Sequence, residues 1–166
     1  MIEIREARAD DLAQMVAIQN ALLTTSTIEW RDAPYTVADR RRWLDAHQAA
    51  AEPVLVAVAG SDVLGFAAYS DFRDTTKWPG YRFTVEHTVH VREDQWGSGV
   101  GRALVEAVVA LARAAGKRSV IAAVDGANAG SIRFHERVGF VEVGRLPHVG
   151  FKHERWLDLV LLQRDV

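Results

Sequence analysis

The feature that most constrains this chain is a glycine-rich segment between a strand-like run and a helix-like run. Gly97, Gly99 and Gly101 occupy alternate positions after the β-patterned residues 84–91 and before the helix-patterned residues 102–115. Glycine has no Cβ, so the backbone of such a turn can adopt positive φ and approach a ligand closely. The free amides in the first turn of the following helix then point at a bound anion. The segment therefore predicts a strand–turn–helix unit whose ligand carries phosphate.

Two better-known phosphate loops do not fit these residues. The Walker loop requires Gly-Lys followed by Ser or Thr, and that tripeptide does not occur in the sequence. The dinucleotide-binding turn requires Gly-x-Gly-x-x-Gly, but counting from Gly97 or Gly99 the sixth position is Arg102 or Leu104. An ordinary strand-to-helix turn also favours glycine. The loop alone therefore leaves a purely structural interpretation open beside the phosphate-binding one.

A second motif follows the buried-strand pattern of residues 119–124. It runs from Asn128 through Ser131 and His135 to the Gly-Phe pair at 139–140. Together, the Gly-x-Gly turn and this motif resemble N-acetyltransferases of the GNAT superfamily, in which the turn holds the coenzyme A pyrophosphate. The resemblance implies a helix that begins at the Asn and the Ser beside the pantetheine arm, with His135 facing the thioester.

Other segments resemble one subfamily more closely. Residues 26–30, 84–89, 150–158 and 163–165 are similar to phosphinothricin and methionine-sulfoximine N-acetyltransferases, and the similarity covers nearly the whole chain. This resemblance implies direct transfer of an acetyl group from acetyl-CoA to the amine of a small amino-acid-like acceptor of the phosphinothricin, methionine sulfoximine or methionine sulfone type. It also implies a homodimer. A protein or peptide N-acetyltransferase and a non-catalytic acetyl-CoA-binding module remain as alternative functions.

The fold class implied is α+β, a GNAT-like three-layer fold whose central sheet is mixed, mostly antiparallel and flanked by helices. Residues 1–166 read as a single domain of that kind. The chain's own patterns predict strand, helix, helix, three strands, helix, strand, helix and two strands. Asp10 or Asp11 is expected to cap a helix that continues to about Leu23. Thr36 with Asp39 resembles a capping box.

Composition limits the partners. The sequence has 20 basic and 22 acidic residues, so there is no electrostatic case for binding nucleic acid or an anionic membrane. No cysteine is present, which excludes a thiol nucleophile and favours direct transfer. No apolar run approaches membrane-spanning length, and the first residues alternate like a strand rather than forming a signal peptide. We therefore expect small-molecule partners and a cytoplasmic location.

Acetyl transfer to an amine needs a base for the ammonium proton, and the leaving thiolate can take a proton from an acid. Glu86 is the candidate base, because a carboxylate in an apolar, β-branched strand has its pKa raised by desolvation. A solvent-facing strand glutamate is the alternative. His135 is the candidate acid, and its alternative is a histidine that bonds to the backbone and holds the loop. Strand alternation puts Glu86, Thr88 and His90 on one face of the strand, opposite His87.

The resemblance also implies how the coenzyme is held. The backbone of Val89 and Val91 would pair with the pantetheine amides, and an amide near Val89 would polarise the thioester carbonyl. One departure concerns the Gln or Arg that usually opens the pyrophosphate loop, because Gln95 falls one place early and Trp96 stands in the expected position. The residues expected to bind acetyl-CoA are Val89, His90, Val91, Trp96, Gly97, Ser98, Gly99, Val100, Gly101, Arg102, Asn128 and Ser131.

The acceptor's carboxylate requires a cation. Arg73, Arg82 and Lys152 lie close in sequence to the matched motifs, and Ile28 and Trp30 are candidates for the pocket wall. The alternatives are surface charges for the cations and core packing for the apolar side chains. No metal site is expected, because two histidines three apart on a strand face opposite sides and no His-x-x-x-His pair occurs.

Overall fold

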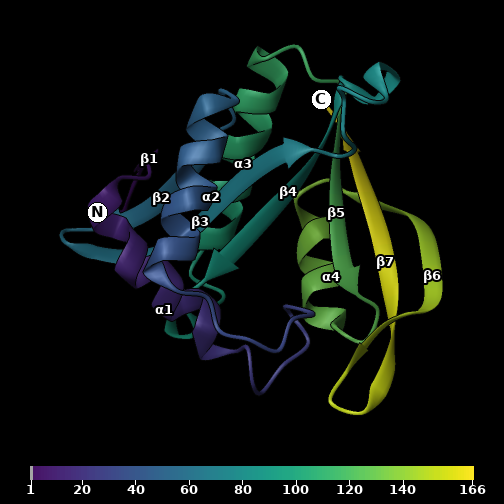
Figure 1. The fold of residues 1–166 in the computed structure, drawn as a ribbon, viewed down its shortest axis with the longest axis horizontal. Helices are drawn as coiled ribbons and strands as arrows, with labels where there is room; N and C mark the ends of the chain where they lie inside the picture. The colour runs from purple at the N-terminus through teal and green to yellow at the C-terminus, as the bar shows by residue number, and fades with distance from the viewer. Residues whose placement is uncertain (1) are drawn as a thin grey trace.

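The computed structural model describes residues 2–166 as one seven-stranded sheet flanked by helices (Figure 1). The strands lie in the order β1-β2-β3-β4-β5-β7-β6. The elements are β1 (Glu3–Glu6), α1 (Leu12–Ala21), α2 (Val37–Ala49), β2 (Val54–Ala59), β3 (Asp62–Asp71), β4 (Thr84–Val91), α3 (Val100–Ala114), β5 (Ser119–Asp125), α4 (Ala129–Arg137), β6 (Val141–Lys152) and β7 (Arg155–Asp165). Only β4 and β5 pair in parallel. The predicted α+β class, element order and mixed, mostly antiparallel sheet are confirmed.

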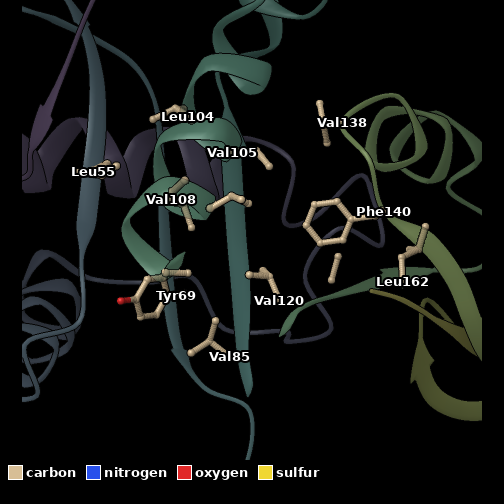
Figure 2. Close-up of a cluster of buried hydrophobic side chains, with 14 of the residues drawn as sticks. Leu55, Tyr69, Val85, Leu104, Val105, Val108, Val120, Val138, Phe140 and Leu162 are labelled. Carbon is tan, nitrogen blue, oxygen red and sulfur yellow. The ribbon is translucent and has the colours of Figure 1, made fainter. Parts of the chain in front are cut away.

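Two apolar clusters occupy the two faces of the sheet. On one face, the apolar side of α3 packs on the central strands, with Leu104, Val105 and Val108 fully enclosed (Figure 2). On the other face, α1 and α2 cover Val56 and Phe66. Burial of these side chains supplies the main stabilisation of the three layers. Within residues 2–166, no helix combines the length and apolar character needed to cross a membrane.

The N-termini of α1 and α2 can be compared with the predicted capping residues. Thr36 and Asp39 form the predicted capping box, because the Asp39 amide donates to Thr36 Oγ1 at 3.0 Å and the Thr36 amide donates to Asp39 Oδ2 at 2.8 Å. Asp11 occupies the N-cap position of α1, as predicted, but its side chain forms no hydrogen bond with the amides of that helix. The Asp11 carboxylate instead accepts two bonds from the Arg5 guanidinium, at 2.8 and 2.9 Å, and one from the Arg8 amide. A charged partner from β1 thus outcompetes the helix amides.

The parallel pairing between β4 and β5 is short, and the candidate site lies where this pairing ends. β4 pairs with β5 only from Thr84 to Glu86, after which β5 continues beside β7 and β4 continues beside β3. Figure 1 shows the two strands diverging from this point. Beyond Glu86, β4 therefore has a strand on one side and, among the described residues, none on the other.

Candidate active site

The three glycines of the turn have two different physical roles. Gly97 and Gly99 have φ of 80° and 95°, a conformation that side-chain-bearing residues rarely adopt, and a Cβ on either would meet no atom within 4 Å. Gly101 lies inside α3, where a Cβ would lie 3.3 Å from the ring of Phe134. Two glycines therefore shape the turn, and the third allows α3 to approach α4.

The turn leaves amides free at the start of α3. Its first backbone bond runs from the Ala103 amide to the Gly99 carbonyl at 3.0 Å. The amides of Val100, Gly101 and Arg102 therefore have no acceptor in the preceding turn of helix. α3 is 15 residues long, and its dipole adds positive potential at this end. These groups fit a pyrophosphate.

Trp96 supports the neighbouring strand. Its indole N–H donates to the Val91 carbonyl at 2.9 Å, while the side chain as a whole is 55% exposed. The Ser98 hydroxyl donates to the Gln95 carbonyl at 2.6 Å, which closes the turn before Gly99. The residue that departs from the family pattern thus holds the end of β4 against the glycine turn.

α4 lies beside the part of β4 that has an open edge, because His135 contacts His87 and a Cβ on Gly101 would meet both Phe134 and Val91. The edge contains the backbone of Val89 and Val91, and an extended amide-bearing chain can add to such an edge as a further strand would. At the start of α4, Asn128 Oδ1 accepts from the Ser131 amide at 3.0 Å. Its carboxamide nitrogen donates no hydrogen bond to the described residues, so this group is left for a ligand.

Glu86 opens into a cavity on the opposite face of the sheet. The cavity has a volume of about 340 Å³ and lies between β3, β4, the two N-terminal helices and the loop that joins them. Burial raises the pKa of the Glu86 carboxyl, and the positive charge of Arg73 partly opposes this rise. Glu86 is half-buried and accepts no hydrogen bond from a described side chain. A carboxylate in this state can accept a proton from an amine.

The cavity contains a charged network that sequence reasoning missed. Glu29 accepts from His90 Nε2 and the Tyr35 hydroxyl, each at 3.1 Å, and also from the Gln19 side chain. Burial acts to raise the pKa of Glu29, but these bonds and the charge of His90 lower it to about 2. The His90 side chain therefore points into this cavity, away from the coenzyme side to which we had assigned the residue. The only sequence signal for Glu29 was its place within the matched segment 26–30.

His135 is enclosed on the other face of β4. It is 4% exposed, its Nδ1 lies 2.8 Å from the Ser131 carbonyl, and its Nε2 lies 3.1 Å from Nε2 of His87. Burial lowers the pKa of both rings, so both are neutral near pH 7. If His135 donates from Nδ1, its Nε2 accepts from His87. This geometry matches the alternative in which His135 bonds to the backbone, and the acid role stays a prediction.

Lys152 has its ammonium group fully engaged. The residue is 4% exposed, and Nζ donates to the carbonyls of Leu23 at 2.6 Å, Ser26 at 3.1 Å and Glu29 at 2.6 Å. An ammonium has three protons, and each has an acceptor here. Lys152 therefore ties the loop after α1 to the end of β6, with no donor left for an acceptor's carboxylate.

The remaining predicted acceptor residues lie outside the cavity wall. Arg82 donates to the Pro79 carbonyl and is exposed. Trp30 donates to the Thr27 carbonyl at 3.0 Å and packs so closely on β6 that only a glycine fits opposite it. Ile28 is 40% exposed. Arg73 is exposed, and among the three predicted cations it is the one whose charge acts on Glu86.

Comparisons with known proteins identify the family of this chain. The family model described as Acetyltransferase (GNAT) family matches residues 15–140. An L-methionine sulfoximine/L-methionine sulfone acetyltransferase of Pseudomonas paraeruginosa is 43% identical over 164 residues, covering 98% of this chain and 94% of the relative. The chain belongs to the GNAT acetyltransferase family. It is an N-acetyltransferase that uses acetyl-CoA as its cosubstrate.

Two solved structures extend the comparison. A GNAT superfamily phosphinothricin acetyltransferase from Sinorhizobium meliloti, in complex with AcCoA, is 31% identical, with a TM-score of 0.92 and coverage of 99% of this chain and 88% of that one. A ribosomal-protein-alanine N-acetyltransferase from Brucella melitensis is 34% identical, with a TM-score of 0.94 and coverage of 99% of each chain. The fold is therefore shared by proteins whose names give small and macromolecular acceptors.

Proposed function

We propose that this enzyme acetylates the α-amine of small amino acids that carry a polar group at the end of the side chain, of the methionine sulfone, methionine sulfoximine or phosphinothricin type. The observation that carries the proposal is the position of Glu86. It lies where β4 leaves β5, between the open strand edge and a cavity of about 340 Å³. That volume lies in the range of small-molecule sites, roughly 300–1,000 Å³.

The roles of the residues follow from this placement. The free amides of Val100, Gly101 and Arg102 hold the pyrophosphate, and the edge of β4 with Asn128 and Ser131 holds the pantetheine. Bound acetyl-CoA supplies the acetyl group as a thioester. Glu86 accepts the proton of the acceptor's ammonium, directly or through one water, so that the free amine attacks the carbonyl carbon. The new C–N bond replaces the C–S bond, and the thiolate takes up a proton.

For the α-carboxylate we propose Arg73, because its charge already acts on Glu86 and the carboxylate and amine of an amino acid share one carbon. For His135 we propose a supporting role. Its pair with His87 fixes the backbone of β4 opposite Glu86, and a thiolate is stable enough to leave without an acid.

A homodimer and a cytoplasmic location also belong to this proposal. The outer strand β6 and the hairpin that it forms with β7 expose an apolar surface that suits a second copy of the chain. Its exposed residues are Val141, Val143, Leu146, Val149, Phe151 and Trp156. Light scattering at several concentrations tests the dimer, and fractionation of producing cells tests the location.

The deciding experiment is a turnover screen with thiol release as the readout. Purified protein and acetyl-CoA are offered methionine sulfone, methionine sulfoximine, phosphinothricin, other free amino acids, polyamines and alanine-terminated peptides. We expect turnover of the first three and loss of that turnover in Glu86→Gln. Robust peptide acetylation without turnover of any free amino acid would refute the proposed acceptor class. Coenzyme binding without turnover of anything would favour a non-catalytic module.

A further inference from the structure

The cavity contains a buried cation that forms no direct ion pair among residues 2–166, although the charge of Glu29 acts on it. Arg40 of α2 lines the cavity and is 6% exposed. Its Nε is enclosed and has no hydrogen-bond partner among residues 2–166, and its guanidinium forms no ion pair with a carboxylate of that part of the chain. The aspartate next to it, Asp39, is bonded to Thr36 and Arg42. An enclosed guanidinium that is hydrogen-bonded to no anion is costly unless a ligand supplies the missing partner.

Aromatic rings hold this guanidinium in place. Its central carbon lies 4.2 Å from the ring centre of Tyr35 and 4.6 Å from that of Trp43. Ring faces attract a cation but satisfy none of its N–H groups. The nearby carboxylate of Glu29 is already bonded to His90, Gln19 and Tyr35. The rings therefore fix the orientation of Arg40 and leave its donors to the cavity.

Arg40 lies at the end of the cavity remote from Glu86. It stacks on Tyr35, which bonds to Glu29, which in turn pairs with His90. His90 is four residues beyond Glu86 on the same face of β4, a separation of about 13 Å along the strand. The charges divide in the same way. Burial raises the pKa of Glu86 and the charge of Arg73 opposes this rise, whereas burial lowers the pKa of Arg40 and the charges of Tyr35 and Glu29 oppose that fall.

We propose that Arg40 binds the oxygen atoms at the far end of the acceptor's side chain. The inference rests on the proposed function, which puts the acceptor's amine at Glu86 and its α-carboxylate close by. A sulfone, sulfoximine or phosphinate then extends toward the other end of the cavity, where a planar, forked donor can bind two of its oxygen or nitrogen atoms. Arg40 is thus a specificity-determining residue: it selects acceptors whose side chain ends in a polar, electron-rich group.

The test compares two acceptors that share the amino-acid head and differ at the distal end, methionine sulfone and norleucine. Each is measured for kcat/KM, or for competitive inhibition if it is not acetylated. In Arg40→Met we expect methionine sulfone to lose about tenfold to a hundredfold, the effect of losing a bond to a charged group. Norleucine should change by less than about threefold, because it offers no group to the guanidinium.

Three controls separate this role from packing. Arg31→Met removes the other guanidinium over the Tyr35 ring, 4.0 Å from its centre, and should leave both acceptors unchanged because Arg31 does not line the cavity. Arg40→Lys keeps the positive charge but lacks the planar guanidinium, so its kcat/KM for methionine sulfone should lie between those of wild type and Arg40→Met. Arg73→Met should weaken methionine sulfone and norleucine alike, because both carry the α-carboxylate. Thermal melting and acetyl-CoA affinity verify that each variant is folded.

Two outcomes would overturn the inference in distinguishable ways. Equal losses for both acceptors in Arg40→Met would show that Arg40 only supports the packing of Tyr35 and Trp43. If that variant does not fold, Arg40→Lys decides. The inference is overturned if the ratio of kcat/KM for methionine sulfone to kcat/KM for norleucine is the same in Arg40→Lys as in wild type. Wild-type protein that neither acetylates methionine sulfone nor is inhibited by it would overturn the proposed function itself.

Discussion

Replacing Lys152 by Met is the sharpest test of how the acceptor side of the enzyme is built. The ammonium donates to three backbone carbonyls of the loop after α1, two of them at 2.6 Å, and the side chain is 4% exposed. Methionine keeps most of the volume but leaves those carbonyls without a donor. A hydrogen bond to a charged group contributes about 1.5–3 kcal/mol, and the three here are offset by the cost of burying the charge.

We therefore expect Lys152→Met to lower the free energy of unfolding by about 3 kcal/mol. For a chain of 166 residues, this corresponds to a fall in Tm of roughly 6–12 °C. Calorimetry measures the fall. Kinetics then compare methionine sulfone with 3-(methylsulfonyl)propylamine, which has the same side chain and amine but no carboxylate.

If Lys152 only holds the loop, the variant loses activity equally on the two acceptors, measured below its melting range. An unchanged Tm together with a KM increase confined to methionine sulfone would refute this reasoning and restore Lys152 as the carboxylate-binding cation. Lys77→Met, at an exposed lysine in a loop away from these contacts, is the matched control and should change neither quantity.

Three further results are expected. Gly99→Val should abolish the rise in Tm that acetyl-CoA produces, because valine resists φ of 95°, and unchanged coenzyme binding in a folded variant would show that another segment holds the pyrophosphate. Glu86→Gln should lower kcat/KM by about a hundredfold or more with little change in coenzyme affinity. In wild type, kcat/KM should also fall on acidification through the raised pKa of Glu86, and this acidic limb of the pH–rate profile should be absent from the variant. Glu29 has its folded pKa lowered from 4.5 to about 2, so its stabilisation, about 3 kcal/mol, is complete above pH 4.5 and lost as the pH falls toward 2. The free energies of unfolding of wild type and Glu29→Gln, measured by urea titration at each pH, should therefore converge over that interval. A constant difference between the two proteins across that pH range would contradict the assignment.

The features that could be predicted from the sequence are those whose signals are local. Positive φ at Gly97 and Gly99 follows from the residue type at a tight turn, and the Thr36–Asp39 box is complete within four residues of chain. The alternation of β4 likewise put Glu86 and His90 on the face opposite His87, as the structure has them. The sequence by itself therefore determined the class of fold, the glycine turn and the face on which the candidate base lies.

Tertiary structure decided how the charged residues are used. Lys152 finds its acceptors 123 to 129 positions earlier in the chain, and His135 meets His87 across 48 positions. Arg40 belongs to a run of three arginines, a sequence pattern typical of a solvated helix face, yet the packing of α2 over the sheet encloses it. A long charged side chain has the same local pattern whether its head group meets water, a carbonyl or a ligand. Only the distant segments that fold against it determine which of these partners it has, because desolvation and hydrogen bonding depend on neighbours in space.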